Sequence, residues 1–322
     1  MKKKSLCLIV ATLFLSVLVA SCDACGSAGA AFAAKKPWDD LVRLYERCEY
    51  DIAEYSVKEE SGESGGDKKL AEGKLVLTLS DGLEGHAVLD MRAEMTYLDV
   101  EENGSDRGLT DVLESKVTFD KVTMIPVSSV KTATLADRLN AINDSYSLDV
   151  DYANDVEKLT FRGETKERAT GTRRQAFDNE QLFYLVRAFA ALGLSGSQSF
   201  PVHVGLDAFN YDIASYTMTM SVNSAPQKVK LDGWKNENVY GLETEDSRPV
   251  ADCYNVSIAI NSSASGTPIN ALYSTVPFAV TPNISTEKVL MSFSTSRYVN
   301  GASDARRTVY TLSDYNALTT GN

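Results

Sequence analysis

The sequence is poor in the side chains that most often carry catalysis or hold metals. It has two histidines among 322 residues, His86 and His203. It has neither a His-Glu-x-x-His motif nor a glycine-rich phosphate loop, so the usual ligands for zinc and for nucleotides are missing. Both histidines stand in apolar or strand-forming segments, where a structural role is the simpler interpretation. We therefore expect no metal and no cofactor.

One pattern imitates a serine hydrolase but lacks its structural context. Residues 62–66 read Gly-Glu-Ser-Gly-Gly, which fits Gly-x-Ser-x-Gly. A nucleophile elbow needs a strand before the serine and a helix after it. The flanking residues here are charged and polar, so they predict a solvated loop. We therefore expect no catalytic residue, and the chain is predicted not to be an enzyme.

The first two dozen residues predict export. Three lysines at positions 2–4 precede an apolar run of 14 residues from Leu6 to Val19. A basic start, a short apolar core and small residues at its end are typical of a secretory signal. The run is shorter than the roughly 20 residues of a spanning helix, and no spanning segment is predicted after it. We expect residues 1–21 to be removed on export.

The tetrapeptide that ends at Cys22, Val-Ala-Ser-Cys, resembles the bacterial lipobox. In that motif, acyl chains such as palmitate are attached to the cysteine and the chain is cut just before it. The resemblance implies a lipoprotein held at the extracytoplasmic face of the cell membrane or in the periplasm. Two or three acyl chains hold a protein firmly, whereas one binds only marginally. The alternative is an ordinary secretory signal that is cut at a later small residue such as Ala30 or Ala34.

The remaining chain divides by composition into a tether and an acidic domain. Residues 22–36 are rich in Ala and Gly and predict a flexible tether. Residues 37–322 form the predicted β-rich extracytoplasmic domain, for which one lobe and two lobes both fit the length. Without the three signal lysines, Lys+Arg falls from 32 to 29 against 44 acids, which gives a net charge of −15. Such a domain repels nucleic acid, so no nucleic-acid partner is expected.

Five cysteines leave two in the predicted domain. Cys7 is lost with the signal, Cys22 is the predicted lipidation site, and Cys25 lies in the tether. Cys48 and Cys253 remain, and two states are open to them. They pair as a disulfide in an oxidising compartment, or they stay as buried thiols.

Alternating apolar residues and turn signals predict a long antiparallel meander. Strands are expected at 75–79, 86–98, 112–122, 146–150, 156–161, 211–222, 252–260, 269–280, 289–298 and 307–312. Turn residues at 80–82 join the predicted strands at 75–79 and 86–98, and those at 153–155 join the predicted strands at 146–150 and 156–161. The predicted fold is mainly β, an antiparallel meander forming a curved sheet or half-barrel around one amphipathic helix.

That helix is predicted at about 178–192. Asp178 is the expected N-cap, and Gln181 three residues later completes a capping box. The apolar side chains that follow recur at i, i+3, i+4 and i+7, which places them on one face. They are Leu182, Leu185, Val186 and Phe189. A face this apolar needs a surface that buries it, and a curved sheet provides one.

Acidic residues gather in one short stretch, Asp149, Asp151, Asp155 and Glu157. A calcium loop would need an ordered set of oxygen ligands, which Ala153 interrupts. Solvated strand faces explain these acids most simply. Glycosidase carboxylates are the alternative, because such pairs are matched in space rather than in sequence.

The second half of the chain resembles a family of bacterial envelope proteins. The resemblance comes from the segment 178–187, Asp-Asn-Glu-Gln-Leu-Phe-Tyr-Leu-Val-Arg, then a strand at 200–204 and a late Tyr273-Ser274 pair. The family is known as domain of unknown function 3108. It implies an extracytoplasmic β-rich fold and supplies no catalytic residues.

These observations predict a lipid-anchored, non-enzymatic extracytoplasmic lipoprotein that binds an apolar ligand or an envelope partner. The membrane is its first partner, through the N-terminal lipid. The alternative function is a cell-envelope polysaccharide hydrolase with paired carboxylates, because neither their spacing nor their burial can be seen in a sequence.

Overall fold

The structure is a computed structural model, and it describes twelve stretches of the chain. These are residues 45–57, 68–134, 145–170, 176–185, 197–207, 212–239, 241–261, 269–275, 279–281, 284–285, 289–299 and 304–318. The predicted signal, Cys22, the predicted tether and the Gly-x-Ser-x-Gly segment all lie outside the described residues.

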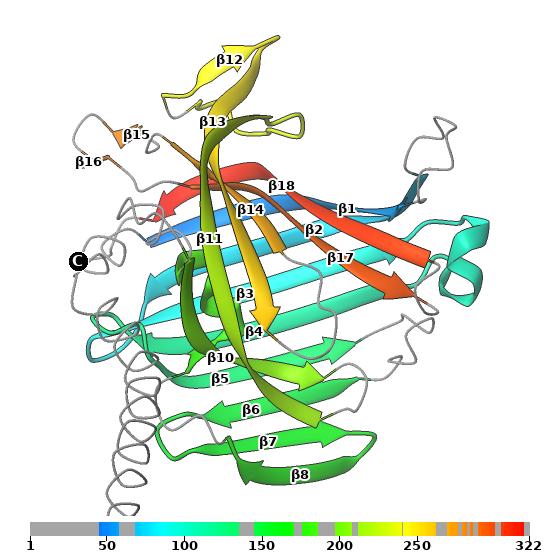
Figure 1. The fold of residues 1–322 in the computed structure, drawn as a ribbon, viewed down its shortest axis with the longest axis vertical. Coiled ribbons are helices and arrows are strands. Elements are labelled where there is room, and N and C mark those ends of the chain that lie inside the picture. The colour runs from blue at the N-terminus through cyan, green and yellow to red at the C-terminus, as the bar shows by residue number, and fades with distance from the viewer. Residues whose placement is uncertain are drawn as a thin grey trace, which may run out of the picture.

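The first half of the described chain is an antiparallel meander in which each strand pairs with the next (Figure 1). Its strands are β1 Tyr45–Val57, β2 Lys68–Asp81, β3 His86–Tyr97, β4 Thr110–Asp120, β5 Pro126–Thr134, β6 Tyr146–Asp151, β7 Val156–Phe161 and β8 Glu164–Ala169. A 3₁₀ helix, η1 Glu101–Asp106, follows β3. The strands predicted at 86–98 and 112–122 and the predicted hairpin at 146–161 are confirmed, and β2 extends the strand predicted at 75–79.

The second half continues the same sheet from its other side. Its strands are β9 Phe177–Asp178, β10 Ser197–Asp207, β11 Asp212–Lys230, β12 Glu243–Glu245, β13 Arg248–Asn261, β14 Ile269–Ser274, β17 Leu290–Val299 and β18 Asp304–Leu318. β15 Ala279–Thr281 and β16 Ile284–Ser285 form a separate two-stranded ladder. The strand predicted at 269–280 is therefore wrong in its second part, because β14 ends at Ser274.

The last strand pairs with the first, which joins the two halves into one sheet. From β8 the order runs through β7, β6, β5, β4, β3, β2 and β1, then β18, β17, β14, β13, β11, β10 and β9, with β12 beside β13. Tyr45 pairs with Leu318 and Val57 with Ala305, so β1 and β18 match along their full length. Among the described strands, this makes a single 16-stranded sheet.

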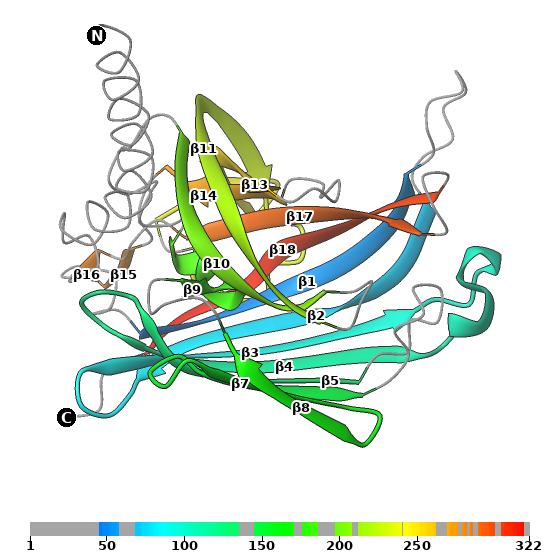
Figure 2. The ribbon, with the colours of Figure 1, turned by 60° about the horizontal axis from the view of Figure 1, so that its bottom comes forward.

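The sheet curves strongly, so that its two ends face each other. Figure 2 shows β10 and β11 arching over the broad part formed by β3 to β8. β9 lies near β5, although β9 is the last strand in the sheet order and β5 is the fourth from the other end. The predicted mainly β fold, a curved antiparallel sheet with one short helix, is confirmed.

The alternation of side chains in β1 and β2 explains why the inner face is apolar. Leu75, Leu77 and Leu79 of β2 are all buried, whereas the residues between them are less so. Tyr50 and Ile52 of β1 point to the same core. Successive side chains of a strand point to opposite faces, so this pattern gives one apolar face and one solvated face.

The predicted helix begins as a 3₁₀ turn. Asp178 closes β9 and caps η2, Asn179–Gln181, and the capping box with Gln181 is confirmed. An α-helical segment follows at 182–185, and the rest of the predicted helix lies outside the described residues. Leu182 and Leu185 are buried in the main core, as predicted. Val186 and Phe189, the other two residues of the predicted face, lie outside the described residues.

Aromatic side chains fill the space between the helix and the sheet. The ring of Phe293 stacks on Tyr310 with centroids 4.0 Å apart and lies 4.7 Å from the ring of Phe183. Tyr273 Oη donates to the carbonyl of Phe183 at 2.7 Å, and Tyr50 Oη donates to the carbonyl of Leu290 at 3.0 Å. The space between the helix and the sheet is therefore a close-packed core. The predicted half-barrel needs such a core to bury the apolar face of the helix.

Candidate functional site

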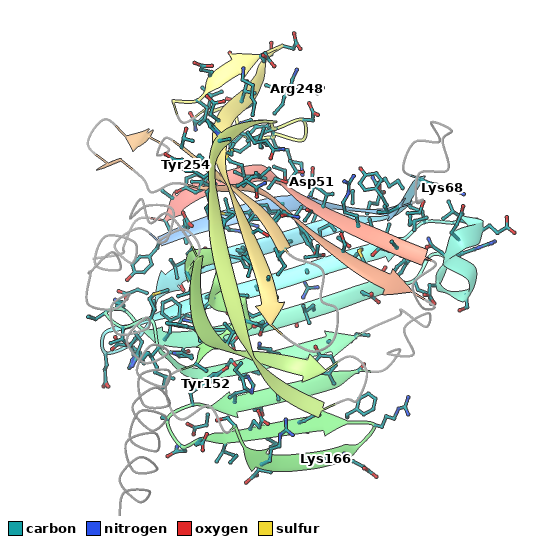
Figure 3. The ribbon with its side chains drawn as sticks, viewed as in Figure 1. Asp51, Lys68, Tyr152, Lys166, Arg248 and Tyr254 are labelled. Atoms are coloured by element: carbon teal, nitrogen blue, oxygen red, sulfur yellow. The ribbon has the colours of Figure 1, made fainter. Side chains whose placement is uncertain are left out.

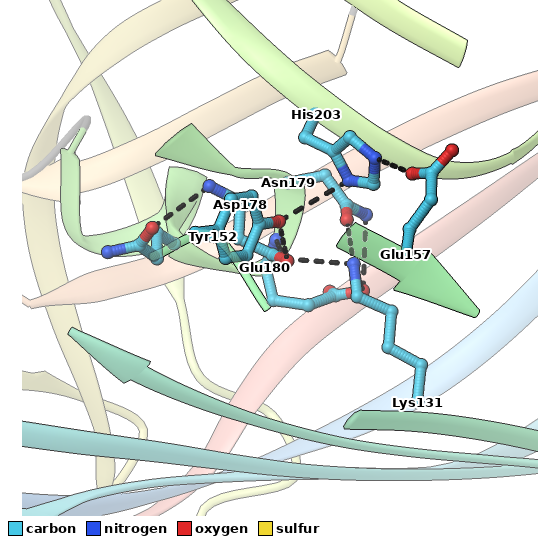
Figure 4. Close-up of polar contacts among 8 residues, drawn as sticks. Lys131, Tyr152, Glu157, Asp178, Asn179, Glu180 and His203 are labelled. Atoms are coloured by element: carbon cyan, nitrogen blue, oxygen red, sulfur yellow. Dashed lines mark hydrogen bonds and ion pairs between the residues drawn. The ribbon is translucent and has the colours of Figure 1, made fainter. Parts of the chain in front are cut away.

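A cluster of buried polar side chains lies where the two ends of the sheet meet (Figure 4). Its residues come from β5, the turn after β6, β7, β9, η2 and β10. We call it the polar cluster, and its members are Lys131, Tyr152, Glu157, Asp178, Glu180 and His203. All six are buried, and Asp178 and His203 have no exposed surface.

Lys131 supplies the positive charge of the polar cluster. Its Nζ donates to Asp178 Oδ1 at 2.8 Å, lies 3.5 Å from Glu180 Oε1, and bonds the side chain of Asn179. Burial alone would lower the pKa of Lys131, but the carboxylates of Asp178 and Glu180 raise it above its usual value. Burial would raise the pKa of Asp178, and Lys131 together with the Tyr152 hydroxyl holds it below its usual value. The Lys131–Asp178 pair is therefore charged.

Tyr152 and His203 extend the polar cluster away from Lys131. Tyr152 Oη donates to Asp178 Oδ2 at 2.6 Å and lies 3.3 Å from His203 Nδ1. His203 Nε2 lies 2.6 Å from Glu157 Oε2, and the other oxygen of Glu157 accepts from Arg168 of β8. Burial and the neighbouring Asp178 charge raise the pKa of Tyr152 well above its usual value. Tyr152 therefore stays protonated, as a donor to Asp178.

The polar cluster connects strands that no backbone ladder connects. Lys131 of β5 binds Asp178 of β9, and Glu157 of β7 contacts His203 of β10, although each pair of strands is far apart in the sheet order. Gln181 adds a further link, because its Nε2 donates to the carbonyl of Met124 before β5 at 2.8 Å. We infer that these contacts hold the curved sheet closed over the helix.

A pocket of about 500 Å³ opens beside the polar cluster. Tyr152 belongs to both, and Figure 3 shows its position below β10. The lining residues come from the start of β3, the end of β4, the turn between β4 and β5, the start of β5, the turn after β6 and the residue before β9. They are His86, Asp120, Thr123, Ile125, Pro126, Val127, Tyr152, Ala153 and Ala176.

A second buried ion pair lies elsewhere in the sheet. Arg306 of β18 is fully buried, and its Nη1 lies 3.2 Å from Glu54 Oε1 of β1. Its Nη2 donates to the carbonyl of Glu102 at 2.9 Å, which fastens η1 to the end of the sheet. Thr308 also donates to Glu54. These contacts join β1, β18 and η1, so the pair stabilises this end of the sheet.

Of the two states open to Cys48 and Cys253, the structure shows the buried free thiols. Cys48 of β1 and Cys253 of β13 are both buried, and no disulfide joins them. Three strands, β18, β17 and β14, separate their strands in the sheet. Burial raises the pKa of Cys253 to about 12, so its thiol is protonated and unreactive.

Cys22 lies outside the described residues, so lipidation stays a prediction. Within the part of the chain that the structure describes, no group of three or more His, Cys, Asp or Glu side chains could hold a metal ion. In the same part, no helix is long and apolar enough to cross a membrane.

The acidic stretch at 149–157 separates in the structure. Asp149 is exposed, and Asp151 accepts from the backbone and side chain of Asn154 in the turn. Glu157 points inward to the polar cluster. The prediction of solvated strand faces is therefore wrong for Glu157, because His203 and Arg168 compensate its burial.

Lys131 and Tyr152 were missed by sequence reasoning. Lys131 follows Val130 in β5, and the structure buries the lysine and leaves the valine 47% exposed. Hydrophobic alternation assigns the opposite faces to these residues. The available signal was the acidic N-cap Asp178, because a buried capping carboxylate requires a cation nearby.

The pH dependence of stability should reveal the charged state of Asp178. Its pKa is lowered in the folded protein, so its contribution is complete above the unfolded pKa of about 3.9 and is lost as pH falls through the folded pKa. We expect Asp178→Asn to be least stable relative to wild type above about pH 4, with the difference narrowing below it. Urea unfolding from pH 2.5 to 6 measures this. A difference that does not change with pH would contradict a charged Asp178.

The fold and the polar cluster define a mainly β protein whose one large antiparallel sheet curves around a short helix. No known protein family matches the chain, and no curated protein matches it. One similar solved structure is a beta-barrel-like protein of domain of unknown function DUF1849 from Brucella abortus. It is 10% identical, with a TM-score of 0.48 over 86% of this chain and 98% of that chain. The resemblance to domain of unknown function 3108 stays a prediction.

Proposed function

We propose that the protein is a lipid-anchored extracytoplasmic lipoprotein that binds an apolar ligand and catalyses no reaction. The observation that carries the proposal is the pocket of about 500 Å³ beside Tyr152. Ligand pockets have volumes of about 300–1,000 Å³ and combine an apolar lining with a few polar groups. Five of the nine lining residues are Ile, Pro, Val or Ala, and the others are His, Asp, Thr and Tyr.

The pocket is built on a rigid frame, which favours binding without chemistry. Asp120 Oδ1 accepts from the backbone of Val122 at 2.9 Å and of Thr123 at 2.7 Å, and so fixes the turn between β4 and β5. Tyr152, another lining residue, is fixed by the hydrogen bond that its hydroxyl donates to Asp178. A preformed pocket avoids the ordering cost of binding.

The arrangement of the acids favours binding over polysaccharide hydrolysis. A glycosidase needs two carboxyl groups that face the sugar from opposite sides. Asp120 is the one carboxylate among the nine residues that line the pocket. The nearby acids of the polar cluster contact cations or His203 instead, with Asp178 and Glu180 at Lys131 and Glu157 at Arg168. The second candidate for binding at this pocket is a protein partner in the cell envelope.

Filling the pocket should abolish ligand binding without unfolding the protein. Ala153 lines the pocket and is exposed, so a tryptophan there can enter the pocket without disturbing the core. We expect Ala153→Trp to raise the Kd for a dansylated fatty acid at least about tenfold, which corresponds to roughly 1.4 kcal/mol. Fluorescence titration measures the Kd.

The matched control is Ala225→Trp, at an exposed position of β11 that does not line this pocket. It should leave the Kd unchanged. If both variants bind as wild type does, the pocket is not the ligand site. If wild type binds no fatty acid and crosslinks instead to an envelope protein, the partner replaces the apolar ligand.

A further inference from the structure

One end of the sheet gathers the start and the finish of the described chain. Tyr45 begins β1 there and pairs with Leu318 of β18. The turn at 82–85 and the turn at 121–125 lie at the same end, because Glu46 pairs with Leu79 and the ladders continue from β2 through β3 to β4. Figure 1 shows this end at the left, opposite the end at which Figure 3 labels Lys68.

The two turns are fastened to each other. The backbone N–H of Lys121 donates to the carbonyl of Gly85 at 3.1 Å, and the Lys121 side chain pairs with Asp81. Within the first turn, His86 Nδ1 lies 2.9 Å from the carbonyl of Leu83. These bonds hold the tips of the turns in fixed positions, side by side.

Each tip presents a large apolar side chain to solvent. Leu83 is 85% exposed and Val122 is 58% exposed, more than any other large apolar residue in the described part of the chain. The pocket opens beside them, since His86 and Asp120 of its lining border the same turns. Singly exposed apolar residues are common, but here two of them stand on adjacent turns that hydrogen bonds hold together, and burying both against an apolar surface would be favourable.

We propose that this end of the sheet rests on the lipid bilayer, with Leu83 and Val122 entering its surface. The inference rests on the lipid anchor of the proposed function. The predicted anchor Cys22 lies 23 residues before Tyr45, and Tyr45 enters the sheet at this same end. The predicted flexible tether covers residues 22–36, and a coil of 15 residues spans about 21 Å on average, so this end would stay close to the membrane.

The charges around the two tips indicate which lipid they meet. Within the described segments 81–86 and 120–125, three acids, Asp81, Glu84 and Asp120, accompany one cation, Lys121, so the two turns carry more negative than positive charge. Anionic head groups attract basic segments and repel acidic ones. The occupant that fits is therefore a zwitterionic lipid, with its acyl chains in contact with the two apolar tips and within reach of the pocket.

Site-specific photocrosslinking tests the contact on the full-length lipoprotein in phosphatidylcholine vesicles. A benzophenone amino acid replaces Leu83, Val122 or, as a control, Val57, an exposed apolar residue at the other end of β1. After irradiation, mass spectrometry measures the lipid adduct. We expect several-fold more adduct at positions 83 and 122 than at position 57.

Flotation of the same samples separates the failure of this inference from that of the proposed function. If the protein floats with the vesicles and the three positions crosslink equally, the anchor stands and the contact surface is overturned. If the protein does not float and a Cys22→Ser variant behaves identically, the lipid anchor itself fails, and this contact fails with it.

Discussion

Replacing Lys131 with Met is expected to lower the free energy of unfolding by about 3–5 kcal/mol, because it leaves a buried carboxylate without its cation. Asp178 has no exposed surface, and Lys131 Nζ is 2.8 Å from its Oδ1. Methionine has nearly the length of lysine, so the packing of the stem is retained while the charge is lost. Urea unfolding at pH 7 measures the change.

Lys158→Met is the matched control for this result. Lys158 lies on β7, its side chain is about half exposed, and its ion pair with Glu167 is 3.8 Å long. Exposed pairs contribute about 0–1 kcal/mol, so this variant should remain close to wild type. A Lys131→Met variant as stable as Lys158→Met would show that Asp178 is protonated or reaches solvent.

A double variant separates the value of the pair from the cost of breaking it. Lys131→Met combined with Asp178→Asn removes the 2.8 Å pair, and a buried pair replaced as a whole is often nearly neutral. Glu180 remains, and burial raises its pKa, which favours its neutral form once Lys131 is gone. We expect the double variant to be more stable than Lys131→Met alone. A double variant as stable as wild type would show that the pair specifies how the sheet closes rather than adding stability.

The closure of the sheet explains why polar groups occupy an otherwise apolar interior. β9 has two residues in its ladder with β10, too few to hold that edge by backbone hydrogen bonds alone. The salt bridge between Lys131 and Asp178 and the contact between His203 and Glu157 have a specific geometry, which apolar packing lacks. They therefore fix the position of this edge of the sheet. Since Tyr152 lies in both the polar cluster and the pocket, the same contacts shape the ligand site.

Local features of the fold could be predicted from the sequence, because short-range physics determines them. Alternation identified β2 through Leu75, Leu77 and Leu79. The capping box of Asp178 and Gln181 identified the start of the helix to the residue. Turn chemistry placed the hairpin of β6 and β7. In that turn, Asp151 Oδ1 accepts a hydrogen bond from the backbone N–H of Asn154.

Other strands could not be predicted because their partners override the local pattern. β5 buries Lys131 and exposes Val130, so its alternation is inverted by a contact with Asp178, 47 residues away. β8 is exposed at every residue and has no apolar face to recognise. The pairing of β1 with β18 joins residues more than 240 apart, a separation that no local pattern reports.

The polar cluster was beyond prediction for the same reason. Glu157 and His203 are 46 residues apart, and each was assigned a role on its own. A carboxylate can be buried without a large energetic cost only where a partner compensates its charge. Here the partner reaches the carboxylate only once the sheet has closed, so a local sequence pattern cannot reveal it. At this site the sequence pattern identified the capping carboxylate of Asp178 but not its cation, Lys131.

Gly73→Ala is expected to be the most damaging single-methyl change in the sheet. Gly73 lies in the interior of β2, between β1 and β3. A Cβ there would lie 1.9 Å from the carbonyl oxygen of Glu94 and 2.8 Å from the Cα of Met95, both backbone atoms of β3. A backbone atom cannot rotate aside, so the two strands must separate. Glycine inside a strand marks such a close approach.

The expected loss in the free energy of unfolding is about 3 kcal/mol, at the upper end of the range for overpacking, because the clash disrupts the ladder itself. This sign opposes the usual effect of Gly→Ala, which stabilises by about 0.4–1 kcal/mol through the unfolded chain where the site accepts it. Circular dichroism during urea unfolding measures the loss. The curved sheet requires this approach of β2 to β3, so the damage should appear as lost cooperativity as well as a lower midpoint.

Gly163→Ala provides the comparison that isolates the clash. Gly163 lies in the turn between β7 and β8 with a φ of +77°, and a Cβ there meets nothing within 4 Å. Its cost is conformational only, about 1 kcal/mol. If Gly73→Ala costs no more than Gly163→Ala, β2 and β3 can move apart without loss. The curvature of the sheet would then depend on the polar cluster at its ends rather than on close contact between its central strands.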